Sequence, residues 1–221
     1  MDERSEIVLI GPVGAGKSTI GGMLAARLGL PQVSMDDIRI DYYREIGYDE
    51  TYAGQLRAEE GFPALVAYWK PFEAYAVERM LADHRDCVFD LGAGHSVYED
   101  PGLFARVREA LMPFRNVVLL LPDPDIETSL SIMESYDPYV VPHREINRHF
   151  LTHPSNGILA RHTIYWRGLT PDQTADAVLA AVSLRQEWHS MLLPEQPIRH
   201  DRDRIPAPES QAGDVNLIHK S

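Results

Sequence analysis

The chain has 221 residues, of which 44% are apolar and 24% charged, which is enough apolar material for one sizeable core. Its formal net charge is −12, and such a surface repels nucleic acid and anionic lipid because Lys and Arg supply most affinity for polyphosphates. No run approaches the roughly 20 apolar residues of a membrane span, the first residues show no secretory signal, and a single cysteine excludes an internal disulfide. We therefore expect a cytoplasmic protein with a small-molecule substrate and no nucleic-acid or membrane partner; the oligomeric state stays open.

Apolar runs and helical periodicity alternate along the chain. The predicted strands are Glu6–Ile10, Gln32–Met35, Asp86–Leu91, Asn116–Leu121 and Thr163–Trp166. The predicted helices are a first one over Ile20–Leu28, then Ile38–Ile46, Tyr52–Glu60, Pro63–His84, Pro101–Met112, Ile126–Ser135, Arg144–Leu151 and Pro171–Trp188. This alternation predicts an α/β fold in three layers, with a central parallel sheet of about five strands between helices. We expect one domain over residues 1–189 and a Pro-rich, mixed-charge tail over residues 190–221.

A glycine-rich loop follows the first predicted strand. Residues 11–18 read GPVGAGKS and fit the pattern G-x-x-x-x-G-K-[ST] between a strand and a helix. The glycines let backbone N–H groups point at phosphate oxygens, and the helix that follows directs its positive end at the same anion. The loop thus predicts ATP with Mg²⁺. The expected nucleotide contacts are Gly11, Val13, Gly14, Ala15, Gly16, Lys17, Ser18 and Thr19, with Lys17 on the transferred phosphate and Ser18 on Mg²⁺.

Three acids end predicted strands beside this loop. Asp36 and Asp37 follow the second strand, and Asp90 ends the third, at the sheet edge where open α/β folds bind ligands. A carboxylate there could orient Mg²⁺ or accept a proton from a substrate hydroxyl. We take Asp36 and Asp90 as metal candidates and Asp37 as the catalytic and substrate-binding candidate. The alternative is that Asp36 or Asp37 only caps the next helix.

Two further segments are candidates for substrate and phosphate contacts. After the third strand, Gly92, Ala93 and Gly94 would let a ligand approach the backbone, and His95 beside them could touch substrate or have no role. Between the fourth and fifth strands, a segment with two prolines precedes Arg144 and Arg148. We interpret this segment as a lid whose arginines approach the charge that develops in catalysis; the alternative is a solvated helix face.

The run GPVGAGKSTIGGMLAARLGLPQVSMDD resembles the opening of shikimate kinases, within the nucleoside-monophosphate-kinase-like P-loop fold, and a weaker likeness spans about residues 5 to 185. The resemblance implies a P-loop kinase fold with a helical lid. It places Asp37 on the acid that grips the substrate hydroxyls, Lys70 on an arginine that precedes a glutamate, here Glu73, and Gly92–Gly94 on a three-glycine turn. The residue against adenine would be Arg167 or Pro171.

The departures from this family concern the substrate. The family's arginine that holds the shikimate carboxylate would fall near Gly157 or Ile158, and Lys70 is a point charge where a bidentate guanidinium is expected. The family's lid arginine, which precedes a proline and leucines, has no counterpart between Ser135 and Arg144. We expect an ATP-dependent kinase for a hydroxyl of another small metabolite. One alternative is an ATP-dependent regulatory or interaction protein, and another, disfavoured by the charge, is a kinase of RNA or nucleotide ends.

Overall fold

The computed structural model describes residues 4–136 and 144–192, with side chains described up to residue 182. Its centre is a sheet of five parallel strands in the order β2-β3-β1-β4-β5. The strands are β1 (Arg4–Ile10), β2 (Gln32–Ser34), β3 (Val88–Asp90), β4 (Phe114–Leu121) and β5 (His162–Tyr165). Because β1 lies between β3 and β4, the chain reverses its direction of winding at the carboxyl end of β1, where such sheets leave a crevice for ligands.

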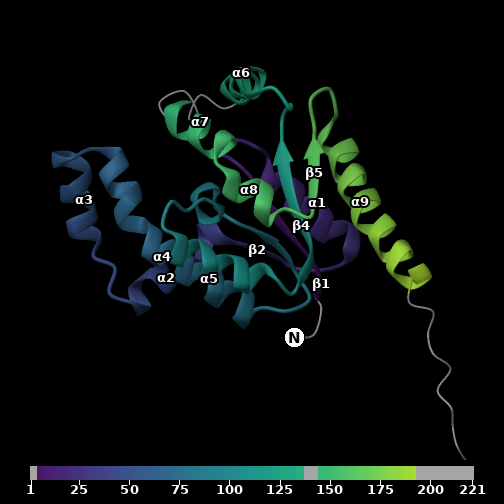
Figure 1. Cartoon of the computed structure of the whole chain (residues 1–221), viewed down its shortest axis with the longest axis horizontal. Coiled ribbons are helices and arrows are strands. Elements are labelled where there is room, and N and C mark those ends of the chain that lie inside the picture. Colours follow the sequence, from purple (N-terminus) through teal and green to yellow (C-terminus); the bar gives the residue numbers. More distant parts are fainter. Residues whose placement is uncertain (1–3, 137–143, 193–221) are drawn as a thin grey trace, which may run out of the picture.

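Helices cover both faces of the sheet (Figure 1). They are α1 (Lys17–Leu28), α2 (Met35–Glu45), α3 (Glu50–Glu59), α4 (Phe62–Asp83), the short 3₁₀ helix η1 (Ala93–Ser96), α5 (Pro101–Leu111), α6 (Ile126–Tyr136), α7 (Arg144–Thr152), α8 (Pro154–Leu159) and α9 (Pro171–Leu192). Figure 1 shows α3 and the first turns of α4 standing away from the sheet. No helix in the described ranges is long and apolar enough to cross a membrane.

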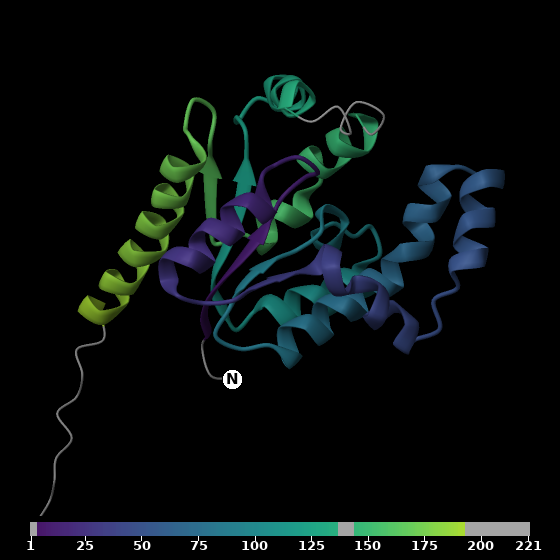
Figure 2. The same cartoon turned by 180° about the vertical axis from the view of Figure 1, so that it is seen from behind.

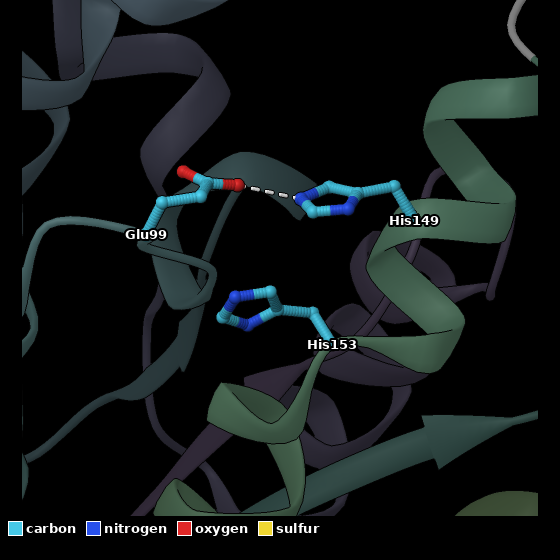
Figure 3. Close-up of side chains that lie close together, drawn as sticks. All are labelled: Glu99, His149 and His153. Carbon is cyan, nitrogen blue, oxygen red and sulfur yellow. Dashed lines mark hydrogen bonds and ion pairs between the residues drawn. The ribbon is translucent and has the colours of Figure 1, made fainter.

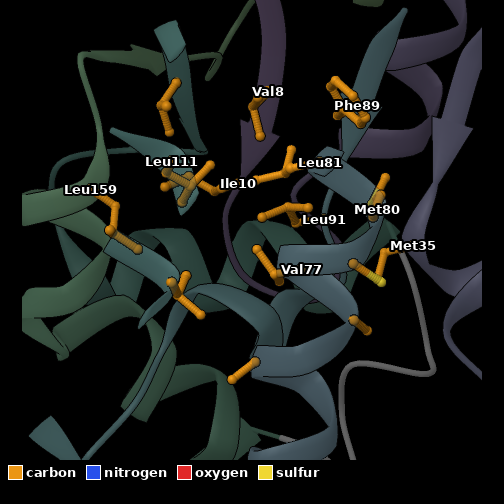
Figure 4. Close-up of a cluster of buried hydrophobic side chains, with 14 of the residues drawn as sticks. Val8, Ile10, Met35, Val77, Met80, Leu81, Phe89, Leu91, Leu111 and Leu159 are labelled. Atoms are coloured by element: carbon orange, nitrogen blue, oxygen red, sulfur yellow. The ribbon is translucent and has the colours of Figure 1, made fainter. Parts of the chain in front are cut away.

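Alternation along the central strand builds two cores. Val8 and Ile10 pack with α4 and α5 in the larger cluster shown in Figure 4. Ile7 and Leu9 face the other way and pack with α1 and α9, which Figure 2 shows on the same face. A strand buried on both faces must be apolar over its buried part, which is why the run that ends in Ile7–Ile10 was recognisable as a buried parallel strand.

The predicted strands and helices are confirmed, with ends shifted by a few residues. The sequence did not predict α8 or η1. Helix α2 begins at Met35, three residues before the predicted start, and Ser34 is its N-cap. The idea that Asp36 or Asp37 caps this helix is therefore wrong, since both lie in its first turn. Helix α9 continues to Leu192, past the predicted domain end at residue 189; the predicted tail beyond it and the lid segment 137–143 lie outside the described residues.

Candidate active site

The phosphate loop leaves β1 and enters α1 through strained glycines. Gly14 and Gly16 have φ of 77° and 85°, in the left-handed region, and Gly16 is the N-cap of α1. A Cβ on Gly11 would lie 2.6 Å from the carbonyl oxygen of Leu120 on β4, so only glycine lets the loop start this close to the sheet. The loop therefore presents its backbone and the positive end of α1 to the crevice.

Lys17 lies in the concave side of this loop. Its Nζ donates to the carbonyl oxygens of Gly11 at 3.0 Å and Pro12 at 2.8 Å. Burial lowers the pKa of Lys17 to about 8, while the nearby carboxylates of Asp36 and Asp90 act in the opposite direction. The lysine is thus held in the loop by neutral carbonyls, and no carboxylate among the described residues lies at hydrogen-bond distance from its ammonium to compete with a phosphate.

Asp90 forms the centre of a polar cluster at the end of β3. Its Oδ1 accepts from Ser18 Oγ at 3.2 Å and from Ser34 Oγ at 3.0 Å, and its Oδ2 accepts from Gln32 Nε2 at 2.5 Å. The carboxylate is buried and next to the first turn of α1. Carboxylate and hydroxyl oxygens are the donors that Mg²⁺ prefers, so this donor set fits the ion. Both Asp90 oxygens already accept hydrogen bonds within the protein, and Ser18 lines the cavity, so Ser18 is better placed than Asp90 to contact Mg²⁺ directly.

A cavity of about 900 Å³ opens beside the phosphate loop. Its lining includes most of the predicted residues, namely Val13, Gly14, Gly16, Lys17, Ser18, Thr19, Asp36, Gly92, Ala93, Gly94 and His95. Gly11 and Ala15 are buried behind the loop surface and Asp90 behind Ser18, so none of the three is part of the cavity wall. The nucleotide candidates and the glycine turn after β3 therefore share one space.

The two acids at the start of α2 differ in position. Asp36 lines the cavity, and its Oδ1 lies 3.9 Å from Arg39 Nε. Asp37 is exposed and does not line the cavity. Consecutive residues of a helix are about 100° apart around its axis, so an α2 that begins at Met35 can direct only one of them at the crevice. The family resemblance placed the substrate contact on Asp37, whereas Asp36, the metal candidate, is the one of the two that lines the cavity.

The turn after β3 is packed against α4. Lys70 Nζ donates to Glu73 Oε2 at 2.7 Å and to the Gly94 carbonyl oxygen at 2.9 Å, so the predicted substrate contact of Lys70 is occupied within the protein, and Lys70 does not line the cavity. A Cβ on Gly94 would lie 2.7 Å from Glu73 Oε1. Burial raises the pKa of Glu73 despite the neighbouring lysine.

His95 is buried under this turn. Its Nε2 lies 3.0 Å from the hydroxyl oxygen of Tyr43, and burial, with Arg39 and Lys70 nearby, lowers its pKa well below the ordinary value. The ring is therefore neutral at physiological pH. The sequence left open whether His95 contacts substrate or has no role. In the structure it is a buried, hydrogen-bonded residue in the wall of the cavity next to the glycine turn.

The arginines predicted to reach the phosphates lie elsewhere. Arg144 pairs with Glu134 and Glu127, and Arg148 pairs with Glu127, which fixes α7 to α6. Neither lines the cavity. Arg167 pairs with Asp123 at 3.0 Å and borders a separate hollow of about 370 Å³ on α6. The assignment of Arg144 and Arg148 to the cavity is thus not met in this arrangement, because acids on α6 satisfy both guanidiniums.

Two other arginines line the cavity instead. Arg39 of α2 lies over the Trp69 ring, 5.4 Å from its centroid, and Arg57 of α3 lies 5.6 Å from the centroid of Phe62. Phe62 and Trp69 themselves meet edge to face. Nothing in the sequence around these arginines indicated a site, since they come from helices that read as ordinary amphipathic segments.

Asn147 of α7 is a further residue that the sequence did not indicate. It is fully buried; its Oδ1 accepts from the Val13 N–H at 3.0 Å, and its Nδ2 donates to the Val13 carbonyl oxygen at 3.3 Å. This paired contact joins α7 to the phosphate loop across 134 residues of sequence. On the same helix, Ile146 and Phe150 line the cavity.

Comparison with known proteins agrees with this architecture. No family model matches the chain. A shikimate kinase of Streptomyces avermitilis is 30% identical over 188 residues, which cover 81% of this chain and 96% of that protein. The chain belongs to the shikimate kinase family. It is an ATP-dependent small-molecule kinase, and the resemblance seen in the sequence is confirmed.

Solved structures confirm the fold. The shikimate kinase of Acinetobacter baumannii, in complex with shikimate, superposes with a TM-score of 0.58 at 22% identity and covers 83% of this chain and 95% of its own. A gluconokinase from Sinorhizobium meliloti superposes with a TM-score of 0.57 at 16% identity over 87% of this chain and 99% of its own. At these identities the likeness establishes the P-loop kinase fold and leaves the acceptor to be argued from the cavity.

Proposed function

We propose that this shikimate-kinase-family protein transfers the γ-phosphoryl group of Mg²⁺·ATP to a hydroxyl of a small metabolite other than shikimate. The observation that supports it best is the shared cavity: one space of about 900 Å³ is bounded by the phosphate loop and by the acid Asp36. Phosphoryl transfer needs a phosphate cradle and an acceptor site in line with each other, and little other chemistry from the protein.

The nucleotide half follows from the loop. Backbone N–H groups of Gly14, Gly16 and the first turn of α1 would hold the phosphates, and Lys17 would exchange the carbonyls of Gly11 and Pro12 for phosphate oxygens. Ser18 would hold Mg²⁺, with Asp90 bonded to its hydroxyl. When bound, this ion neutralises charge on the transferred phosphoryl group.

The acceptor half is assigned to Asp36 in place of Asp37. Asp36 borders the cavity near Lys17 and would orient the acceptor hydroxyl and take its proton during attack. The aromatic and guanidinium groups of Arg39, Trp69 and Arg57 form the outer wall and fit a hydroxylated ring or chain that carries an anionic group.

The case against shikimate rests on where the charges are. Gly157 and Ile158, where the family resemblance places a carboxylate anchor, lie on α8 outside the cavity and carry no charge. Lys70 is occupied by Glu73 and Gly94. Loss of a charged hydrogen bond costs about 1.5 to 3 kcal/mol, so two losses would weaken shikimate binding by roughly a hundredfold or more. The guanidinium groups that do line the cavity, those of Arg39 on α2 and Arg57 on α3, come from other directions, which favours an acceptor whose shape differs from that of shikimate.

The test is a screen of polyols, sugars, sugar acids and hydroxylated ring metabolites, with shikimate among them, for acceptor-dependent ADP release with Mg²⁺. We expect saturable turnover with at least one hydroxyl compound and weak turnover with shikimate. Efficient saturation at low shikimate concentration would make shikimate the acceptor. Slow hydrolysis that no acceptor stimulates would favour the regulatory alternative.

A further inference from the structure

A second group of reactive side chains lies outside the cavity, where α7 and α8 approach the segment after η1 (Figure 3). Glu99, His149 and His153 place their ligand atoms within 4.8 Å of one another. His149 Nε2 lies 2.6 Å from Glu99 Oε1, and the two imidazole centroids are 5.2 Å apart. The side chains of His149 and Glu99 are 43% and 59% exposed, so a hydrated ion can reach them.

We propose that Glu99, His149 and His153 bind a divalent transition-metal ion of the zinc type. Two imidazoles and one carboxylate, with water in the fourth position, form a common ligand set for Zn²⁺. His149 lies in the last turn of α7, and His153 directly follows this helix, where its backbone N–H donates to the His149 carbonyl oxygen at 2.9 Å. Figure 3 shows both rings facing the Glu99 carboxylate. Nitrogen donors select this class of ion over Mg²⁺ and Ca²⁺.

His153 is already oriented for this role. It is the N-cap of α8, where its Nδ1 accepts from the Ser155 N–H at 3.3 Å, which leaves Nε2 on the side of the other two ligands. For Nε2 to bind the ion, its proton moves to Nδ1, which then no longer accepts from the Ser155 N–H, so metal binding costs α8 this one long cap hydrogen bond. At His149 the ion takes the place of the proton now shared with Glu99. No other group in the cluster has to be displaced.

The ion would join two walls of the catalytic cavity. Helix α7 carries Asn147 against the phosphate loop and Phe150 into the cavity wall, and Glu99 follows five residues after Gly94 of the acceptor turn. An ion bound to both α7 and the segment after this turn would hold the two at a fixed separation. Metal binding should therefore raise the melting temperature of the protein without nucleotide.

The test uses the full chain without a histidine tag, in excess Mg²⁺ so that the oxygen ligands around Ser18 are occupied. Zn²⁺ binding is measured by calorimetry, and Co²⁺ serves as a spectroscopic probe of nitrogen ligation. The variants are His149→Ala, His153→Ala and Glu99→Gln. His84→Ala is the matched control, because His84 is a partly buried histidine that contacts Tyr42 at a distant place.

We expect one equivalent of Zn²⁺, a Co²⁺ spectrum of low-symmetry nitrogen and oxygen ligation, and loss of both in each histidine variant. Glu99→Gln should weaken binding by roughly 10-fold or more, since even partners outside the ligand shell change metal affinity by that factor. His84→Ala should bind as the parent does. Absence of binding would overturn the proposal, and so would binding that survives in either histidine variant, which would assign the metal to other histidines of the chain.

Discussion

The phosphate loop comes from eight consecutive residues, whereas the opposite wall of the cavity takes its side chains from α2, α3, α4, η1 and α7. In the loop, backbone geometry carries the function, so the glycines and Lys17 are fixed by one local pattern. In the acceptor wall, each side chain depends on how its helix is placed. A loop built from consecutive residues can keep its function when the rest of the fold changes. The acceptor wall, by contrast, can change its substrate specificity when any of its helices moves or changes its side chains. The following experiments separate the two halves.

The largest effect is expected from Lys17→Ala. Removal of the only cationic side chain of the loop should lower kcat/KM by roughly 10²- to 10³-fold or more, the scale for loss of a preorganised charge-stabilising donor. The fold should persist, because Lys17 bonds only two loop carbonyls. Arg27→Ala is the control: it removes a cation from the far end of α1, where Arg27 pairs with Asp172 and Asp176. Unchanged turnover in Lys17→Ala would remove the nucleotide assignment.

The next effect distinguishes the two acids of α2. Asp36→Asn should lower kcat by about 10²-fold, the lower range for a positioned base, with little change in the KM for ATP. Asp37→Asn is the matched control, since it makes the same chemical change one residue on, outside the cavity. Steady-state kinetics with a saturating acceptor measures both. If Asp37→Asn proves the more damaging, the acceptor assignment returns to the residue that the family resemblance selected.

A smaller effect should come from the contact that joins the two halves. Asn147→Ala leaves Val13 without its paired partner and should raise the KM for ATP by roughly 30-fold, which corresponds to about 1 kcal/mol for each of the two lost hydrogen bonds. Asn156→Ala removes a similarly buried amide, which bonds the Phe150 carbonyl and does not touch the loop. Both variants should melt earlier, but only Asn147→Ala should change nucleotide binding. Equal KM values for ATP in the Asn147→Ala and Asn156→Ala variants would mean that α7 stabilises the fold but does not contribute to nucleotide binding.

The smallest effect near neutral pH is a pH dependence of nucleotide binding. In the ligand-free protein the pKa of Lys17 is about 8, and the bound phosphates favour its protonated form. ATP affinity should therefore be constant below pH 8 and fall at higher pH, by up to about tenfold per unit. Near pH 8, binding should take up protons, which calorimetry in buffers of different ionisation enthalpy detects. The stability of the ligand-free fold changes with the opposite sign. Between about pH 8 and pH 10.5 the unfolded chain binds more protons than the folded chain, so the contribution of Lys17 to the free energy of unfolding rises with pH. Affinity that stays constant to pH 10 would contradict the lowered pKa.

Several features could be predicted from the sequence because they are local. The run Ile7–Ile10 is apolar at every position, as a strand with two covered faces requires, and GPVGAGKS can form its loop wherever a strand and a helix flank it. The start of α2 was predicted three residues late, at Ile38 where the helix begins at Met35, and the role of Asp37 that the family resemblance implies stays a prediction. The short helix α8 was missed because six residues hold too little periodicity to show a helix.

The sequence by itself determined the α/β class with a parallel sheet, the phosphate loop with Lys17 and Ser18, and the glycine turn of Gly92 and Gly94, since each depends on neighbours along the chain. Only the tertiary structure decided which arginines face the cavity: Arg144 and Arg148 pair with acids on α6, while Arg39 and Arg57 are brought in by α2 and α3. It also joined Asn147 to Val13 and brought Glu99 next to His149 and His153. The physical reason is that a side chain's partners at long sequence separation are set by how helices pack. Apolar periodicity shows which face of a helix is buried, but it does not show which other element covers that face.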